Sequence, residues 1–100
     1  MNDTSEYQHS DLYFRVTYAD VGMKYPLIES FVFVGKNIGC DDHSDTWYFQ
    51  PARSFAMYGS VLSTDSGDRM VVAADEKEAE EMLDVRGLMV ELQNAAQRRM

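Results

Sequence analysis

The sequence has little of the chemistry that marks a secreted or membrane protein. Its 100 residues include one cysteine, Cys40, so no disulfide can form within the chain, which is typical of a reducing cytosol. No stretch approaches the roughly eighteen consecutive apolar residues of a membrane-spanning helix. The first ten residues also lack the positive start and the apolar run of a secretory signal. We therefore predict a cytoplasmic protein that has no membrane partner.

Catalytic, cofactor and metal motifs are also missing. Residues 39–47 bring Cys40 and His43 close to three aspartates, but a structural zinc site needs about four cysteine or histidine ligands. A calcium loop starting at Asp41 lacks its glycine and its final glutamate. The aspartates disfavour a reactive Cys40 thiolate, and the scattered glycines exclude a phosphate-binding loop. We interpret the segment as a solvated turn and predict no catalytic residue, no metal and no cofactor.

Positive charge is scarce and dispersed. Nine Lys and Arg residues stand against 17 Asp and Glu residues, which gives a net charge of -8. Only Arg98 and Arg99 are adjacent, at a predicted helix C-terminus where they complement the helix dipole. Because no basic stripe could follow a phosphate backbone, we expect no direct nucleic-acid contact. An anionic surface of this kind attracts a basic protein partner instead.

The apolar residues predict one α+β domain over residues 11–100, after a flexible leader at 1–10. Hydrophobic residues make up 45% of the chain and include twelve aromatics, enough for a single core. Alternation of apolar and polar residues predicts a half-buried strand over 12–18. A run that is apolar on both faces after Pro26 predicts a central strand, and residues 46–50 predict a third.

The second half of the chain predicts helices and a hairpin. Pro51 and Gly59 bracket a short helix, and residues 60–63 and 69–73 flank a hairpin turn. A capping box at Asp75 predicts a helix that continues to about Gln97, with a break at Gly87 as the alternative. Its core-facing stripe comprises Met82, Val85, Met89, Leu92 and Ala96. The predicted fold is thus an antiparallel sheet of four to five strands, with one long C-terminal helix packed on one face and a short helix after the third strand.

The opposite side of that helix carries an acidic row. At 100° per residue, Glu76, Glu80, Asp84 and Glu91 point away from the apolar stripe. Like charges four residues apart destabilise a helix by a few tenths of a kcal/mol, so helix stability does not explain them. We predict that this edge joins acidic loops in one interface for a positively charged groove, although a purely solvated face is the alternative. The loop residues of this interface are Asp41, Asp42, Asp45, Asp65 and Asp68.

In this physical profile the chain resembles the small, acidic, single-domain proteins that phages encode against bacterial defences, of which the anti-CRISPR proteins are the best-known class. The features that carry the resemblance are the size, the net charge of -8, the acidic row and the absence of catalytic motifs. The resemblance implies a non-enzymatic inhibitor of a basic, nucleic-acid-handling partner in the host cytoplasm. That class shares no fold or sequence signature, so no residue role is carried over.

Other functions fit the same sequence. An immunity protein or antitoxin that neutralises a cationic toxin would present the same acidic surface. A small enzyme or ligand-binding module would need a pocket between the sheet and the helix. A homodimer could use the Met82 and Met89 side of the helix or an edge of the sheet, and this alternative also stays open.

Overall fold

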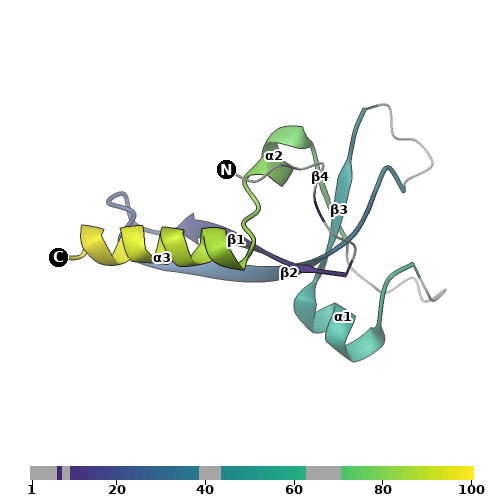
Figure 1. Ribbon diagram of the computed structural model, residues 1–100, viewed down its shortest axis with the longest axis horizontal. Coiled ribbons are helices and arrows are strands. Elements are labelled where there is room, and N and C mark those ends of the chain that lie inside the picture. The colour runs from purple at the N-terminus through teal and green to yellow at the C-terminus, as the bar shows by residue number, and fades with distance from the viewer. Residues whose placement is uncertain (1–6, 8–9, 39–43, 63–70) are drawn as a thin grey trace.

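The strands form a single curled antiparallel sheet. The structure is a computed structural model that describes Tyr7 and residues 10–38, 44–62 and 71–100. Its four strands follow one another in the order β1-β2-β3-β4, so each strand pairs with its neighbour in the chain (Figure 1). The elements are β1 (Leu12–Tyr18), β2 (Pro26–Lys36), β3 (Trp47–Pro51), α1 (Ala52–Tyr58), β4 (Val72–Ala74), α2 (Glu76–Glu80) and α3 (Val85–Arg98). The predicted α+β fold, with a C-terminal helix and a short helix after the third strand, is confirmed.

The hairpin of β1 and β2 is closed by an aspartate. The Asp20 carboxylate accepts hydrogen bonds from the backbone N–H of Lys24, at 2.9 Å, and of Tyr25, at 3.1 Å. The bond from Lys24, followed by that from Tyr25, holds the pKa of the Asp20 carboxyl below its ordinary value. Asp20 therefore fixes the turn that the sequence indicates between these strands.

A bulge between β2 and β3 requires a glycine. The register of the two strands shifts between Phe33 and Gly35. Gly35 has a φ of +155°, and a Cβ added there would lie 2.7 Å from the Cγ2 atom of Ile38. Only glycine fits this backbone conformation and this close approach. The bulge bends β2, and the curl of the sheet follows from such bends.

An aromatic cluster fills one face of the sheet. Phe49 is fully buried at its centre, and its ring centroid lies 5.5 Å from that of Phe33. Tyr7, from the segment predicted as a leader, packs on this cluster with its ring centroid 4.5 Å from that of Tyr13. Its hydroxyl donates a hydrogen bond to the carbonyl oxygen of Ala79, so the cluster extends to α2. These contacts anchor α2 on the sheet.

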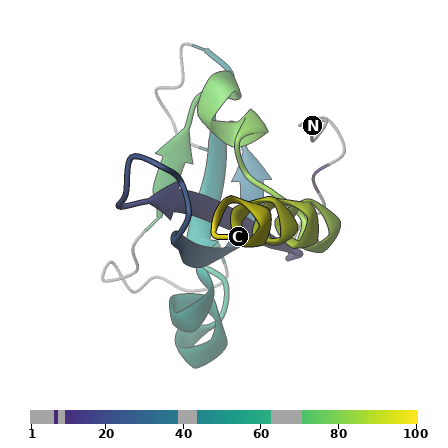
Figure 2. The same ribbon diagram turned by 90° about the vertical axis from the view of Figure 1, so that its left-hand side faces the viewer.

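A buried amide holds α1 and the following turn on the sheet. Gln50 is fully buried, and its Nε2 donates to the Oγ of Ser54 at 3.0 Å and to the carbonyl oxygen of Gly59 at 3.1 Å. Its Oε1 accepts from the backbone N–H of Val61 at 2.9 Å. The side chain thus satisfies both its donors and its acceptor without water. α1 and α2 lie near opposite ends of β3 (Figures 1 and 2).

The prediction of one continuous helix over residues 75–97 is wrong. Leu83, in the link between α2 and α3, exchanges two backbone hydrogen bonds with Phe14 of β1, at 2.7 and 2.8 Å. The Asp84 carboxylate then accepts the N–H of Gly87 at 2.7 Å and starts α3 as its N-cap. A Cβ at Gly87 would lie 3.3 Å from both the Asp84 carboxylate and the Leu83 side chain. Gly87 therefore belongs to a helix start, and the break precedes it.

α3 turns a different side to the hairpin from the one predicted. Val85 and Met89, which the sequence places in the core, are 55% and 57% exposed. Ala95 is fully buried, and Leu88 and Glu91 lie on its side of the helix. The packed side is rotated from the predicted stripe by roughly a quarter turn. Apolar side chains of α3 therefore lie on the outside of the molecule.

The predicted hairpin over residues 60–73 is also corrected. Residues 60–62 form no strand, since residues 61–62 lie in a turn, and β4 pairs with β3, with Trp47 opposite Ala74. Residues 63–70, which include the predicted hairpin turn, lie outside the described residues. β4 thus completes the sheet as an edge strand beside β3.

α3 and the outer part of the β1–β2 hairpin project together from the rest of the molecule (Figure 1). We call residues 16–28 and 85–100 the arm. Arg98 donates to the carbonyl oxygen of Met23 at 2.9 Å, and Arg99 donates to that of Lys24 at 2.6 Å. These bonds tie the end of α3 to the hairpin turn. With the arm projecting, the molecule measures 48 × 29 × 22 Å.

Candidate acidic interface

Negative charge is concentrated in the ten residues from Asp75 to Asp84, which we call the acidic segment. It comprises α2 and the link to α3, and six carboxylates against one lysine give it a formal charge of -5. All six carboxylate residues are exposed. They are Asp75, Glu76, Glu78, Glu80, Glu81 and Asp84. This segment therefore carries most of the chain's net charge of -8.

Three of these carboxylates start helices. The predicted capping box is present, because Asp75 accepts the N–H of Glu78 at 2.8 Å and Glu78 accepts the N–H of Asp75 at 3.2 Å. Asp84 caps α3. Between the caps, the buried Ala79 and Met82 belong to the aromatic core cluster. The acidic segment is thus held at both ends and in the middle, although α2 has only five residues.

The other three carboxylates are Glu76, Glu80 and Glu81. Within the part of the chain that the structure describes, none of their side chains makes a hydrogen bond or an ion pair. Glu80 and Asp84, which the acidic row needs on the outside, are both exposed. Neither helix capping nor ion pairing among the described residues therefore explains why Glu76, Glu80 and Glu81 are acidic.

A shallow groove joins the acidic segment to the loop before β3. Its volume is about 560 Å³. It is lined by Ser44, Asp45, Asp75, Glu76, Lys77 and Glu80. Asp45 accepts a hydrogen bond from Asn37 at 3.0 Å and pairs with Lys36 at 3.3 Å, and these contacts lower the pKa of its carboxyl. The structure thus places one predicted loop aspartate beside the predicted helix carboxylates.

Glu91 does not lie on the acidic edge where the sequence places it. Its carboxylate accepts a hydrogen bond from the Tyr18 hydroxyl and lies 3.4 Å from the Arg98 guanidinium. The side chain is only 25% exposed. Burial, and then the bond to Glu91, raise the pKa of Tyr18. The predicted row of four is therefore wrong, because the link interrupts it and its last member faces the hairpin.

Some of the predicted residues fall outside the described part of the chain. These are Cys40, Asp41, Asp42, His43, Asp65 and Asp68. Among the residues that the structure does describe, no three His, Cys, Asp or Glu side chains are grouped to hold a metal ion. The helices of those same residues include none with the length and apolar character needed to span a membrane.

Sequence reasoning missed the side chains that fix α3 to the hairpin. The helix dipole explains why basic residues occur at the C-terminal end of α3, but it does not predict their hydrogen-bond partners. Arg98 reaches a carbonyl oxygen 75 residues away in the chain, and its guanidinium lies over the Tyr18 ring at 5.6 Å from the centroid. Arg99 likewise lies over the Tyr25 ring, at 5.8 Å. No local pattern signals such long-range contacts.

Comparison of the chain with protein-family models, with curated proteins and with solved structures found no match. No residue role is therefore transferred from a relative. The functional assignment rests on the acidic segment, the groove and their surroundings.

Proposed function

We propose that this chain is a non-enzymatic binding protein that inhibits a basic, nucleic-acid-handling partner, in the manner of the phage anti-CRISPR proteins. The interface is the acidic segment together with Asp45. The observation that carries the proposal is that Glu76, Glu80 and Glu81 are exposed and unpaired within the described residues, on a segment that two caps and a buried core hold in place. Because the backbone of this segment is held in place, only the glutamate side chains lose conformational freedom when a cationic surface binds them.

The charges set what such an interface can achieve. An exposed ion pair contributes only about 0.2–1 kcal/mol, so several carboxylates must act together. A field of one sign also raises association rates by about 10- to 1,000-fold at low salt. Residues four apart in α2, such as Glu76 and Glu80, are separated by about 6 Å along the helix, against about 3.4 Å between phosphates of one DNA strand. The segment is therefore a partial mimic of nucleic acid, and its partner recognises clustered carboxylates.

The packing beneath α2 supports surface binding over the alternative of a ligand pocket. The rings of Tyr7, Tyr13, Phe33 and Phe49 occupy the space between the sheet and α2, together with Met82. An enzyme of the alternative kind would need convergent polar groups around a cavity in that place. The polar groups of the acidic segment instead face outward.

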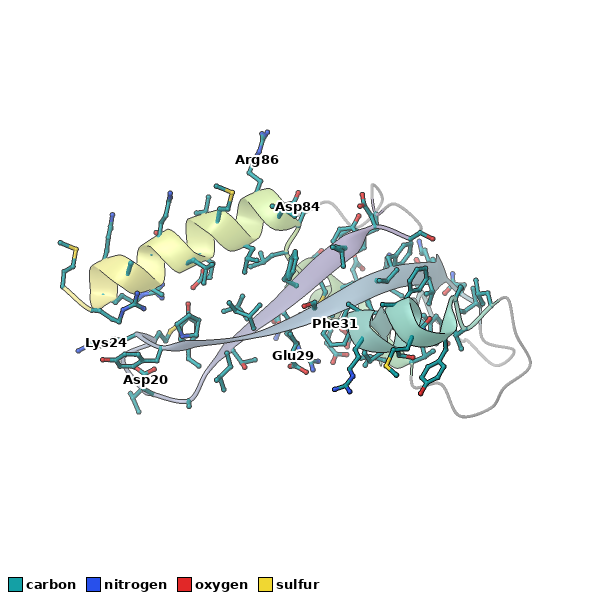
Figure 3. All side chains as sticks on the ribbon, turned by 90° about the horizontal axis from the view of Figure 1, so that it is seen from below. Asp20, Lys24, Glu29, Phe31, Asp84 and Arg86 are labelled. Carbon is teal, nitrogen blue, oxygen red and sulfur yellow. The ribbon has the colours of Figure 1, made fainter. Side chains whose placement is uncertain are left out.

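Affinity capture with matched charge reversals tests the proposal. Wild-type protein and its Glu80→Lys and Glu29→Lys variants, each changed by two charges, are used to capture partners from host cells. Glu29 points away from Asp84 on the opposite side of the hairpin (Figure 3). It pairs with Arg15 at 2.9 Å, so circular dichroism checks that its variant is folded. We expect wild type and the Glu29→Lys variant to capture a basic nucleic-acid-binding protein that the Glu80→Lys variant does not capture. Duplex DNA should displace this protein from wild type. Equal capture by both variants contradicts the interface, and a cationic toxin as the captured protein favours the immunity-protein alternative.

A further inference from the structure

Exposed apolar side chains gather on the arm. Among the described residues, nine of the fourteen large apolar side chains that are exposed belong to it. They are Val21, Met23, Tyr25, Leu27, Ile28, Val85, Met89, Val90 and Met100. Within the described part of the chain, the arm therefore carries most of the exposed large apolar side chains.

The outer side of α3 has a groove of its own, which we call the α3 flank. Its volume is about 540 Å³. It is lined by Val85, Arg86, Met89, Val90 and Gln93. Val85, Met89 and Val90 are each more than half exposed, and Arg86 points away from the hairpin (Figure 3). Among the residues that the structure describes, no carboxylate lines this groove, in contrast to the groove of the acidic segment.

We propose that a second copy of this chain covers the α3 flank, with the two α3 helices antiparallel about a twofold axis between Met89 and Val90. In this pairing Met89 of each copy faces Val90 of the other, so apolar side chains meet at the centre. Arg86 of each copy faces Gln93 of the other, whose amide oxygen can accept its hydrogen bonds. The flank is thus self-complementary, as an interface with twofold symmetry requires.

The charges at the two ends of α3 select the antiparallel orientation. The acidic segment, with its formal charge of -5, lies at the N-terminal end of α3. At the other end, three cations against two carboxylates give +1, from Lys24, Arg98, Arg99, Asp20 and Glu91. An antiparallel pair sets each acidic end beside the basic end of the other copy, whereas a parallel pair sets the acidic ends together. The helix dipoles favour the same arrangement.

The pairing is independent of the identity of the basic partner. It can therefore fail while the proposed function holds, and the reverse is also true.

Sedimentation equilibrium of matched variants tests the dimer. Met89→Glu places a carboxylate on the α3 flank, whereas Met57→Glu makes the same change on α1, where Met57 is 58% exposed against 57% for Met89. We expect twice the chain mass of 11.4 kDa for wild type and Met57→Glu, and the single-chain mass for Met89→Glu and for a second flank variant, Val90→Glu. Circular dichroism checks that each variant is folded.

Three results overturn the pairing. One is a wild-type protein that stays monomeric up to about 1 mM. The second is a dimer that survives both Met89→Glu and Val90→Glu, and the third is equal dissociation by Met57→Glu. If wild type is monomeric and Met89→Glu weakens capture of the basic partner, that partner occupies the flank instead.

The orientation is tested by disulfide formation in a Cys40→Ser background. Arg86→Cys and Gln93→Cys proteins are purified separately and mixed under oxidising conditions. An antiparallel pair forms the mixed disulfide in preference to either self-linked product. A predominance of self-linked products contradicts the antiparallel arrangement.

Discussion

Replacement of Gln50 by leucine should destabilise the fold strongly without touching the acidic segment. The fully buried amide makes three hydrogen bonds, at 2.9, 3.0 and 3.1 Å, which leucine cannot replace. Each buried polar group left without a partner costs about 1–3 kcal/mol. Ser54, Gly59 and Val61 are only half-buried, so water can bond to some of the polar groups that lose Gln50 as their partner. The buried leucine side chain also offsets part of the cost through the hydrophobic effect. We expect the free energy of unfolding to fall by about 2–4 kcal/mol.

Urea denaturation followed by tryptophan fluorescence measures this change. Trp47 is the single tryptophan and is 3% exposed, so its emission reports the loss of the core. At an m-value of about 1.5 kcal/mol per molar urea, the midpoint should fall by roughly 1–3 M. The matched control is Gln97→Leu, an exposed position on α3, which should stay within about 0.5 kcal/mol of wild type. A change below about 1 kcal/mol for Gln50→Leu would refute the buried hydrogen-bond network.

Three further substitutions probe the arm and the bulge between β2 and β3. Tyr18→Phe removes the hydroxyl that bonds Glu91 and should cost about 1–2 kcal/mol in urea denaturation. The pKa of Tyr18 in the folded protein is raised above 10.0, so the contribution of Tyr18 to stability is full below that pH and declines above it. The free energy of unfolding of wild type should therefore fall between about pH 8 and 12 by an amount that the variant does not show. Gly35→Ala should cost about 1–3 kcal/mol, because of its φ of +155° and the 2.7 Å approach to Ile38, and an unchanged melting temperature would contradict the bulge. The pKa of Asp20 in the folded protein lies below 3.8, so its contribution to stability is full above that pH and is lost as the pH falls further. Asp20→Asn should therefore reduce the loss of stability that wild type shows at acidic pH. An unchanged loss at acidic pH would contradict the role of Asp20 in the turn.

The first three strands could be predicted from the sequence because their signals are local. Alternating side chains from Leu12 to Tyr18 and the apolar run after Pro26 both became strands with nearly the predicted bounds. The short helix between Pro51 and Gly59 and the capping box at Asp75 are also local patterns, and both are present. Local periodicity was therefore sufficient for the fold class.

The break before α3 could not be predicted in the same way. Leu83 leaves the helix to pair with Phe14, nearly 70 residues earlier, and this exchange of backbone bonds depends on the folded sheet. The one local signal was Asp84 as an N-cap, with apolar residues on either side of it. Because the link sets where α3 begins, missing it also misplaced the helix face that carries Met89 and the position of Glu91.

The candidate interface was predicted in part. Glu76 and Glu80 are outward as expected and share a groove with Asp45, although no helix periodicity could have placed that loop beside them. Glu91 was misplaced, since its partners Tyr18 and Arg98 come together only when α3 lies on the hairpin. Charge and helix geometry therefore locate an acidic segment, and tertiary contacts decide which of its members stay free.

The most direct test of the acidic interface is the salt dependence of partner binding for wild type and for a Glu76→Gln/Glu80→Gln double variant. Removing two carboxylates from the contact should raise the dissociation constant and make it less sensitive to salt between about 50 and 300 mM. A double variant that binds with the affinity and the salt dependence of wild type would contradict the account.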